Sequence, residues 1–194
     1  MKILTICGSP RKGNSEAVSL RIKELLEKRG VENEIILLRE KNIERCSGCV
    51  EYCGRELRCW KKDDFAEIRK KMEQAQGYVF VSPAYFNMPP GIFKDLIDRC
   101  CVLYAAKTDF SGKSAMVIAL GEEKIEEINA CLKNISENFC GVLGIPVAAE
   151  KSFRSKSELK GNFNDIFENN LNAGIEKELE EMAERLYSCL QKQK

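Results

Sequence analysis

The chain has 194 residues, and none of them is histidine. The missing side chain is the one that most often acts as general acid or base near neutral pH, so we assign no catalytic acid or base. Histidine is also a common nitrogen ligand of zinc, copper and iron in proteins. Any site for a soft metal ion in this chain must therefore be built from sulfur.

The sequence also lacks an excess of charge and a long apolar run. The 31 basic and 30 acidic residues leave a net charge of +1, which gives no electrostatic footprint for nucleic acid. No apolar run approaches the roughly 20 residues that cross a bilayer, so we expect no membrane partner. The start, MKILTICGSP, enters a strand directly and does not resemble a signal peptide, which predicts a cytoplasmic protein.

Cysteine, in contrast, is abundant, with ten in the chain. Four of them follow the spacing C-x2-C-x3-C-x5-C, at Cys46, Cys49, Cys53 and Cys59. A loop this short, at about 42–62, can place its thiolates around one inorganic centre, and iron–sulfur clusters need such thiolates. Structural zinc also accepts four thiolates, but zinc ribbons use two C-x2-C pairs and this loop has one. The spacing favours a [4Fe–4S] cluster, with zinc, and disulfides or free thiols, as alternatives.

The other cysteines lie in apolar or helical contexts. We expect them to be buried as small apolar side chains. They are Cys7, Cys100, Cys101, Cys131, Cys140 and Cys189.

Strand-like and helix-like segments alternate along the chain. The predicted strands are 2–7, 34–39, 77–82, 113–120 and 145–149, and the predicted helices are 15–29, 63–76, 91–104, 122–143 and 173–190. This alternation predicts an α/β fold with a parallel sheet covered on both faces and wound in both directions. Five strands favour the flavodoxin-like order 2-1-3-4-5, with the cysteine loop as an insertion after the second strand. We expect one domain over 1–194, with 150–170 as a surface segment that contacts a neighbouring subunit.

Ligands of such sheets bind where the carboxyl ends of the strands meet. The loop GSPRKGNS follows the first strand and leads into a helix, whose N–H groups and positive dipole end attract a phosphate. It matches neither the G-x-G-x-x-G pattern nor the Walker A pattern. Its candidate phosphate contacts are Ser9, Arg11, Lys12, Gly13, Asn14 and Ser15.

Two further loops are expected at the same edge. In SPAYFNMPP, Pro83 stiffens the exit from the third strand, and Tyr85 and Phe86 offer aromatic surface to a flat ring. Backbone amides beside them can reach the polar edge of that ring. The loop at Gly121, after the fourth strand, offers backbone contacts to the other side of a flavin.

These motifs together resemble the NAD(P)H-dependent FMN reductase family of flavodoxin-like proteins. GSPRKGNS, the cysteine loop and SPAYFNMPPGIFKDLIDR carry the resemblance, which extends to about residue 121 and is most similar to the branch called iron–sulfur flavoproteins. The resemblance implies FMN at the sheet edge, a [4Fe–4S] cluster on the insertion, and homodimers or dimer-based tetramers. It also implies that the ring of FMN is held by Pro83, Ala84, Tyr85, Phe86 and Asn87.

One feature departs from the motif of that branch. The second and third cysteines are usually two residues apart there, whereas three residues, Val50-Glu51-Tyr52, separate Cys49 from Cys53 here. The extra residue changes the direction of one sulfur.

A flavin exchanges electrons singly or in pairs, and a cluster exchanges them one at a time. We therefore expect an oxidoreductase that moves electrons from a ferredoxin-like protein or NAD(P)H to a small acceptor, with the cysteines beside the flavin edge. One alternative is a metal- or redox-sensing binding protein with little or no flavin activity. Another is a dimerisation module that a metal stabilises.

Overall fold

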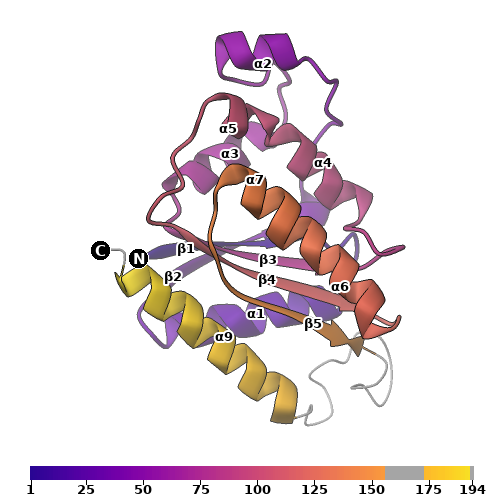
Figure 1. Ribbon diagram of the computed structural model, residues 1–194, viewed down its shortest axis with the longest axis vertical. Helices are drawn as coiled ribbons and strands as arrows, with labels where there is room; N and C mark the ends of the chain where they lie inside the picture. The colour runs from indigo at the N-terminus through magenta and orange to yellow at the C-terminus, as the bar shows by residue number, and fades with distance from the viewer. Residues whose placement is uncertain (156–172, 193–194) are drawn as a thin grey trace.

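A parallel sheet of five strands forms the centre of the molecule, in the order β2-β1-β3-β4-β5 (Figure 1). This confirms the predicted flavodoxin-like topology. The computed structural model describes residues 1–155 and 173–192. The strands are β1 (Lys2–Cys7), β2 (Glu32–Leu37), β3 (Gly77–Pro83), β4 (Ser114–Gly121) and β5 (Val147–Arg154).

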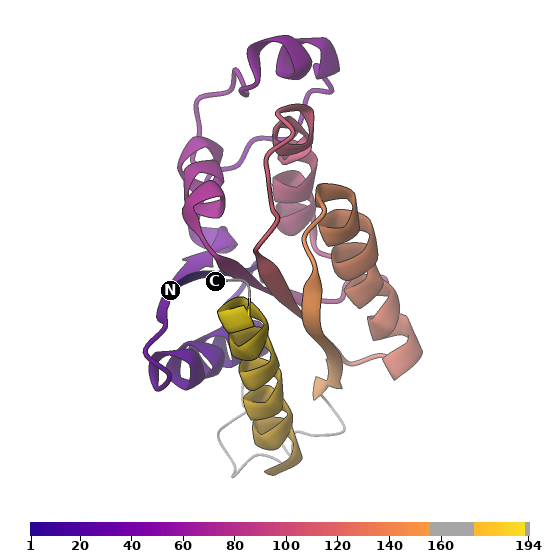
Figure 2. The ribbon, with the colours of Figure 1, turned by 60° about the vertical axis from the view of Figure 1, so that its left-hand side comes forward.

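Helices cover both faces of the sheet (Figures 1 and 2). Helices α1 (Asn14–Glu27) and α9 (Ala173–Lys192) lie on one face, and α3 (Phe65–Gln74), α4 (Gly91–Arg99) and α6 (Ile125–Lys133) lie on the other. The shorter helical segments are η1 (Leu38–Glu40), α2 (Val50–Glu56), α5 (Cys101–Ala105), η2 (Asn134–Cys140) and α7 (Gly141–Leu143). No helix of the described part is long and apolar enough to span a membrane.

Each strand contributes alternate side chains to the two faces, so the core has two halves. Tyr78 and Phe80 of β3 lie in the half under α3, α4 and α6, while Val79 and Val81 lie in the half under α1 and α9. All four side chains are fully buried. Each burial of this kind contributes about 1.5–3 kcal/mol, so the alternation fixes which face each helix covers.

Some strands and helices have different bounds from those predicted, because side-chain burial outweighs the local sequence pattern. Strand β5 continues to Arg154 rather than ending at 149, because Phe153 is buried in the core half under α9. Residues 150–155 are thus largely strand, and the rest of the predicted surface segment lies outside the described residues. The helix predicted at 91–104 divides at Cys100 into α4 and α5, and the one predicted at 122–143 contains the π-helical segment η2.

A buried ion pair joins the cysteine loop to α4. The Arg99 guanidinium donates to both carboxylate oxygens of Asp63, over 2.6 and 3.0 Å, and to the carbonyl oxygen of Glu44 over 2.8 Å. The side chains of Arg99 and Asp63 are only 1% and 0% exposed. Asp63 also accepts from the backbone N–H groups of Glu44 and Phe65. The pair therefore holds the chain on both sides of the four loop cysteines.

Burial opposes the ionised form of Asp63, but the hydrogen bonds from Arg99 and from the Glu44 amide outweigh it. Together they hold the pKa of Asp63 below its usual value of 3.8. A carboxyl whose pKa falls on folding stabilises the protein above its unfolded pKa, and that contribution is lost as the pH falls through the folded value.

We predict that Asp63→Asn lowers the free energy of unfolding by about 3–5 kcal/mol at neutral pH, because it leaves the Arg99 charge buried without a counter-ion. Urea unfolding followed by circular dichroism measures the change. The matched control is Asp64→Asn, since Asp64 accepts only a backbone N–H, from Asn42, in a more exposed position. Its effect should stay within about 0.5 kcal/mol.

The difference in stability between wild type and Asp63→Asn should be full above pH 3.8 and should shrink on acidification below it. A difference that does not change with pH would contradict the assignment of this stability to the ionised carboxylate.

Candidate functional site

The loop after β1 is shaped by a close approach to α4. The Gly8 N–H donates to the carbonyl oxygen of Val81 over 2.8 Å, which continues the pairing of β1 with β3. A Cβ atom on Gly8 would lie only 2.4 Å from Cδ1 of Phe93. Glycine at this position is what lets α4 pack directly beneath the loop.

The same loop closes on itself and then starts α1. The Ser9 hydroxyl donates to the Arg11 carbonyl oxygen over 2.7 Å. Gly13 is the N-cap residue, and its carbonyl oxygen accepts the first helical bond from the Ala17 N–H. The positive end of the α1 dipole therefore lies at the loop, which is the arrangement that favours a phosphate.

The loop after β3 makes a tight turn at Tyr85–Met88. The backbone groups of Tyr85 and Met88 exchange hydrogen bonds of 2.9 and 3.0 Å, and Phe86 and Asn87 take φ angles of 50° and 64°. Two successive positive φ angles are the signature of a type I′ turn. The Phe86 side chain is 97% exposed and does not line the pocket between the loops, so its contact with a flat ring stays a prediction.

The loop after β4 is supported by the end of β5. The Ser155 hydroxyl donates to the Gly121 carbonyl oxygen over 3.0 Å, and the Arg154 guanidinium lies 3.4 Å from the Glu122 carbonyl oxygen. The Glu123 carboxylate accepts a hydrogen bond from the Glu122 N–H. It also lies close to Gly121, since a Cβ atom added there would be only 3.1 Å from it. The backbone of this loop is thus fixed from two sides.

A pocket of about 140 Å³ lies between these three loops. It brings together most of the residues that the sequence predicted, namely Ser9, Arg11, Gly13, Asn14, Ser15, Pro83, Ala84, Tyr85 and Gly121. Lys12, Phe86 and Asn87 do not line it. Glu123 and Ser155 line it and were missed. Extending the fifth strand to its buried Phe153 would have placed Ser155 at this edge.

The cysteine loop contains a helix that the sequence pattern did not reveal. Cys49 is the N-cap residue of α2, and the Cys53 N–H donates to the Cys49 carbonyl oxygen over 3.1 Å. Residues four apart lie on the same face of a helix. The three-residue gap that departs from the family motif is therefore the spacing that directs the Cys49 and Cys53 side chains to one side.

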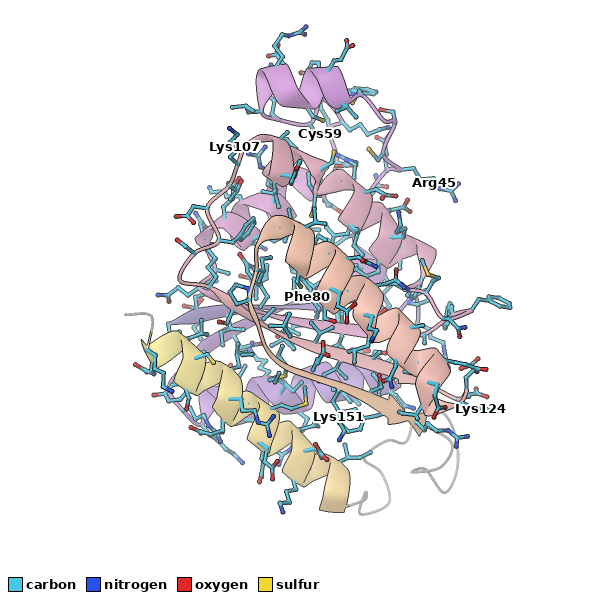
Figure 3. All side chains as sticks on the ribbon, viewed as in Figure 1. Arg45, Cys59, Phe80, Lys107, Lys124 and Lys151 are labelled. Carbon is cyan, nitrogen blue, oxygen red and sulfur yellow. The ribbon has the colours of Figure 1, made fainter. Side chains whose placement is uncertain are left out.

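The loop thiols lie close enough to influence one another. The Ser47 hydroxyl, 3.7 Å from the Cys49 sulfur, lowers the pKa of Cys49, with further help from Trp60 and Cys53. Burial, and the neighbouring Cys49 and Cys59, raise the pKa of Cys53, while Cys101 acts in the opposite direction. Figure 3 shows Cys59 between α2 and α5. In the described residues no three ligand side chains are arranged around a position for one metal ion.

Arg99 places a buried donor beside this cluster. Its Nε–H has no hydrogen-bond acceptor, although the guanidinium is enclosed and interacts with the Cys59 sulfur. An enclosed N–H without an acceptor is costly in a folded protein, and a charged sulfur centre would provide the missing acceptor. The donor set is thus all sulfur, with a cation beside it.

The two candidate sites lie at opposite ends of α4. The loop Pro83–Pro90 precedes α4 and forms part of the pocket, whereas Arg99 and the cysteines lie at its C-terminal end. None of the residues 42–62 lines the pocket. Helix α4 is about 14 Å long at 1.5 Å per residue and lies between the pocket and the cysteines within one subunit, so the position of the cysteines beside a flavin edge stays a prediction.

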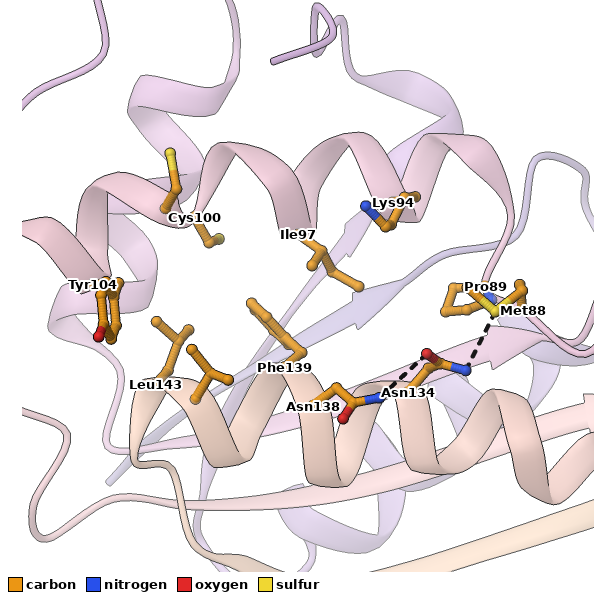
Figure 4. Close-up of a pocket in the computed structure, with 12 residues that line it drawn as sticks. Met88, Pro89, Lys94, Ile97, Cys100, Tyr104, Asn134, Asn138, Phe139 and Leu143 are labelled. Carbon is orange, nitrogen blue, oxygen red and sulfur yellow. Dashed lines mark hydrogen bonds between the residues drawn. The ribbon is translucent and has the colours of Figure 1, made fainter. Parts of the chain in front are cut away.

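A separate apolar groove of about 300 Å³ runs between α4 and α5 on one side and η2 and α7 on the other (Figure 4). The amide of Asn134 spans one end, donating to the Met88 sulfur over 3.3 Å and accepting from Asn138 over 3.4 Å. Tyr104 and Val142 at the other end are 65% and 62% exposed. The groove offers contact area but little polar chemistry.

Several known proteins are similar in sequence to this chain. An iron–sulfur flavoprotein of Archaeoglobus fulgidus is 37% identical over 124 residues, which make up 63% of this chain and 63% of that protein. The match thus spans less than two thirds of that relative's length. An iron–sulfur flavoprotein of Methanocaldococcus jannaschii is 32% identical over 150 residues, covering 76% of this chain and 75% of that protein.

Solved structures share the fold at lower identity. An FMN-dependent NADH-azoreductase of Bacillus anthracis, solved with FMN, has a TM-score of 0.69 and 18% identity, covering 96% of this chain and 99% of its own. The NAD(P)H:acceptor flavoenzyme FerB of Paracoccus denitrificans has a TM-score of 0.68 and 14% identity, covering 98% and 97%. At these identities the likeness concerns the fold.

The sequence model of one family matches residues 1–152, which is well over half of the chain. Since the fold and the three loops at the sheet edge agree with this match, the chain belongs to the NADPH-dependent FMN reductase family.

Proposed function

We propose that this protein binds FMN and transfers electrons between a donor, NAD(P)H or a ferredoxin-like protein, and a small acceptor, with an iron–sulfur cluster as its second redox centre. The observation that carries the proposal is the pocket at the carboxyl edge of the sheet, where a helix N-terminus and Arg11 meet an aromatic loop. FMN, when bound, supplies both hydride and single-electron chemistry.

In this proposal the phosphate of FMN lies on the loop after β1. The first turn of α1 and the side chains of Ser9, Arg11, Asn14 and Ser15 provide donors and positive charge there. Lys12 adds only long-range attraction, because its side chain is exposed and outside the pocket lining. The residues present therefore fit a phosphate ester.

The ring of FMN lies between the other two loops. The N–H groups of Ala84 and Tyr85 already donate to Leu120 and Met88, so they are not available to the ring. Phe86 and Asn87 instead contribute their backbone N–H groups, which the type I′ turn directs away from its own hydrogen bonds. Tyr85, Pro83 and the Gly121 backbone supply the surface beside the ring.

The iron–sulfur cluster in this proposal is held by Cys46, Cys49, Cys53 and Cys59. The support is the all-sulfur donor set, the shared face of Cys49 and Cys53 on α2, and the unpaired Nε–H of Arg99 beside Cys59. A donor beside a cluster sulfur raises the reduction potential, so Arg99 favours the reduced state. The relatives named iron–sulfur flavoproteins agree with this assignment.

The proposal also includes a second copy of the chain, which binds at the apolar groove. The apolar groove between α4 and η2 carries exposed Tyr104 and Val142 at one end, and apolar surface of this kind marks contacts between proteins. A homodimer or tetramer formed there is the state we propose. The single domain and the cytoplasmic location stay predictions.

We predict that Arg11→Ala weakens FMN binding roughly tenfold or more, because it removes a charged donor worth about 1.5–3 kcal/mol. Titration of the protein without flavin, followed by quenching of FMN fluorescence, gives the dissociation constant. Lys12→Ala is the matched control and should change it by less than about twofold. Equal losses in the two variants would contradict the placement of the phosphate.

Anaerobically purified protein should show flavin absorbance together with a broad cluster band, and both should bleach within roughly seconds after mixing with a competent donor. Stopped-flow mixing with NADPH, NADH and a reduced ferredoxin in turn identifies the donor. If no donor reduces the flavin, the proposed electron transfer is wrong. A finding of one zinc ion per chain without acid-labile sulfide would show that the cluster assignment is wrong. A protein without flavin or cluster absorbance would favour the sensing alternative.

Val142→Glu should lower the mass in solution from that of the oligomer to that of the monomer, because it places a charge in an apolar contact. Light scattering after size exclusion measures the mass. Leu20→Glu introduces the same charge at an exposed apolar position on α1, on the other face of the sheet, and should leave the mass unchanged. An unchanged mass for Val142→Glu would exclude this groove as the interface.

A further inference from the structure

Glu16 occupies a position from which a side chain can close the N-terminus of α1. Gly13 is the N-cap residue of this helix, so Glu16 stands at the position called N3. A glutamate at N3 commonly reaches back and accepts a hydrogen bond from the N-cap N–H. Such a bond would occupy a donor at the end of α1 where the proposed function puts the phosphate of FMN.

The Glu16 side chain does not close the helix in this structure. In the described part of the chain, no side chain caps the start of α1 by a hydrogen bond. Glu16 does not line the pocket between the three loops, although Asn14 and Ser15 before it do. It lines a hollow of about 260 Å³ beside the edge strand β2 instead. The carboxylate is therefore directed away from the pocket.

Arg39 holds the carboxylate in that direction. Its Nη1 atom lies 3.0 Å from Oε2 of Glu16. Both atoms are enclosed by protein, and the two side chains are 19% and 12% exposed. Arg39 also contacts Glu40 over 3.1 Å, but the Glu40 side chain is 61% exposed. Because water screens the outer pair more strongly, the pair with Glu16 is the stronger of the two.

The sheet itself brings Arg39 to the start of α1. Arg39 belongs to η1, which directly follows β2. Leu37 at the end of β2 is paired with Cys7 at the end of β1, and Leu38 beside Arg39 is fully buried. The backbone that carries the guanidinium is thus fixed next to the loop after β1.

We propose that Arg39 is a positioning residue of the phosphate site, which keeps the Glu16 carboxylate off the N-terminus of α1. This inference rests on the proposed function, since it requires FMN to bind at that helix end. Arg39 directs the side chain toward β2, and it also balances a negative charge that would repel the phosphate. A full turn of helix rises only about 5.4 Å, so an unpaired carboxylate at N3 lies close to a phosphate at the helix end.

The test measures the dissociation constants of FMN and of riboflavin for the full chain freed of flavin, by quenching of flavin fluorescence. The variants are Arg39→Gln, Glu16→Ala and the pair of both. The matched control is Arg29→Gln, because Arg29 is also partly buried and pairs with Glu184 over 3.0 Å, but beyond the other end of α1. Circular dichroism confirms that each variant is folded.

We expect Arg39→Gln to weaken FMN binding about three- to tenfold, because the released carboxylate competes with the phosphate for the helix end. Adding Glu16→Ala should return the constant to within about twofold of wild type, and Arg29→Gln should stay within the same range. The loss in Arg39→Gln should shrink in about 1 M salt, where the Debye length is about 3 Å. Riboflavin, which has no phosphate, should bind wild type and Arg39→Gln equally.

Three results would overturn the inference while leaving the proposed function intact. One is an unchanged FMN constant in Arg39→Gln. The others are a pair variant that stays as weak as Arg39→Gln and an equal loss for riboflavin, since either would show that Arg39 only supports the local fold. A wild-type protein that does not bind FMN would overturn the proposed flavin site and the inference together.

Discussion

The buried pair of Arg99 and Asp63 is the interaction on which the cysteine site depends. A guanidinium enclosed in protein must have its charge balanced, and Asp63 balances it through two hydrogen bonds. Because Asp63 follows the four loop cysteines and Glu44 precedes them, the same contacts hold the chain on both sides of the cysteines against α4. Among the described residues, the cysteine loop has no hydrogen bonds to the strands of the sheet, and the Arg99–Asp63 ion pair holds it in place instead.

Helix α4 connects this pair to the other candidate site. At its start, Phe93 packs against Gly8, so the loop after β1 and the helix after β3 are in contact without an intervening side chain. At its end, Arg99 binds Asp63 and Glu44, which lie on the two sides of the loop cysteines. The pocket at the sheet edge and the cysteine loop are therefore both held by α4, which also forms one wall of the apolar groove. Changes at any of the three places act on the same helix.

Much of the pocket was predictable because strand ends are readable in a sequence. Most of the predicted residues of GSPRKGNS, though not Lys12, meet Pro83–Tyr85 at the pocket, since parallel strands bring their carboxyl ends to one edge. The exposure of Phe86 could not be predicted, because nothing in its local sequence shows that the turn takes two positive φ angles. Ser155 was missed because β5 continues through polar residues whose partners come from β4.

The sequence by itself determined the fold, the position of the loop after β1 that lines the pocket, and the sulfur character of the second candidate site. Those properties depend on periodicity, on glycine and on residue chemistry, all of which are local. The tertiary structure decided how the cysteine loop is arranged: the spacing of Cys49 and Cys53 acquires its meaning from α2, and α2 packs against α5. It also placed the two candidate sites at opposite ends of α4. No short sequence motif indicates this arrangement, because it depends on the length of α4 and on the buried charge at its end.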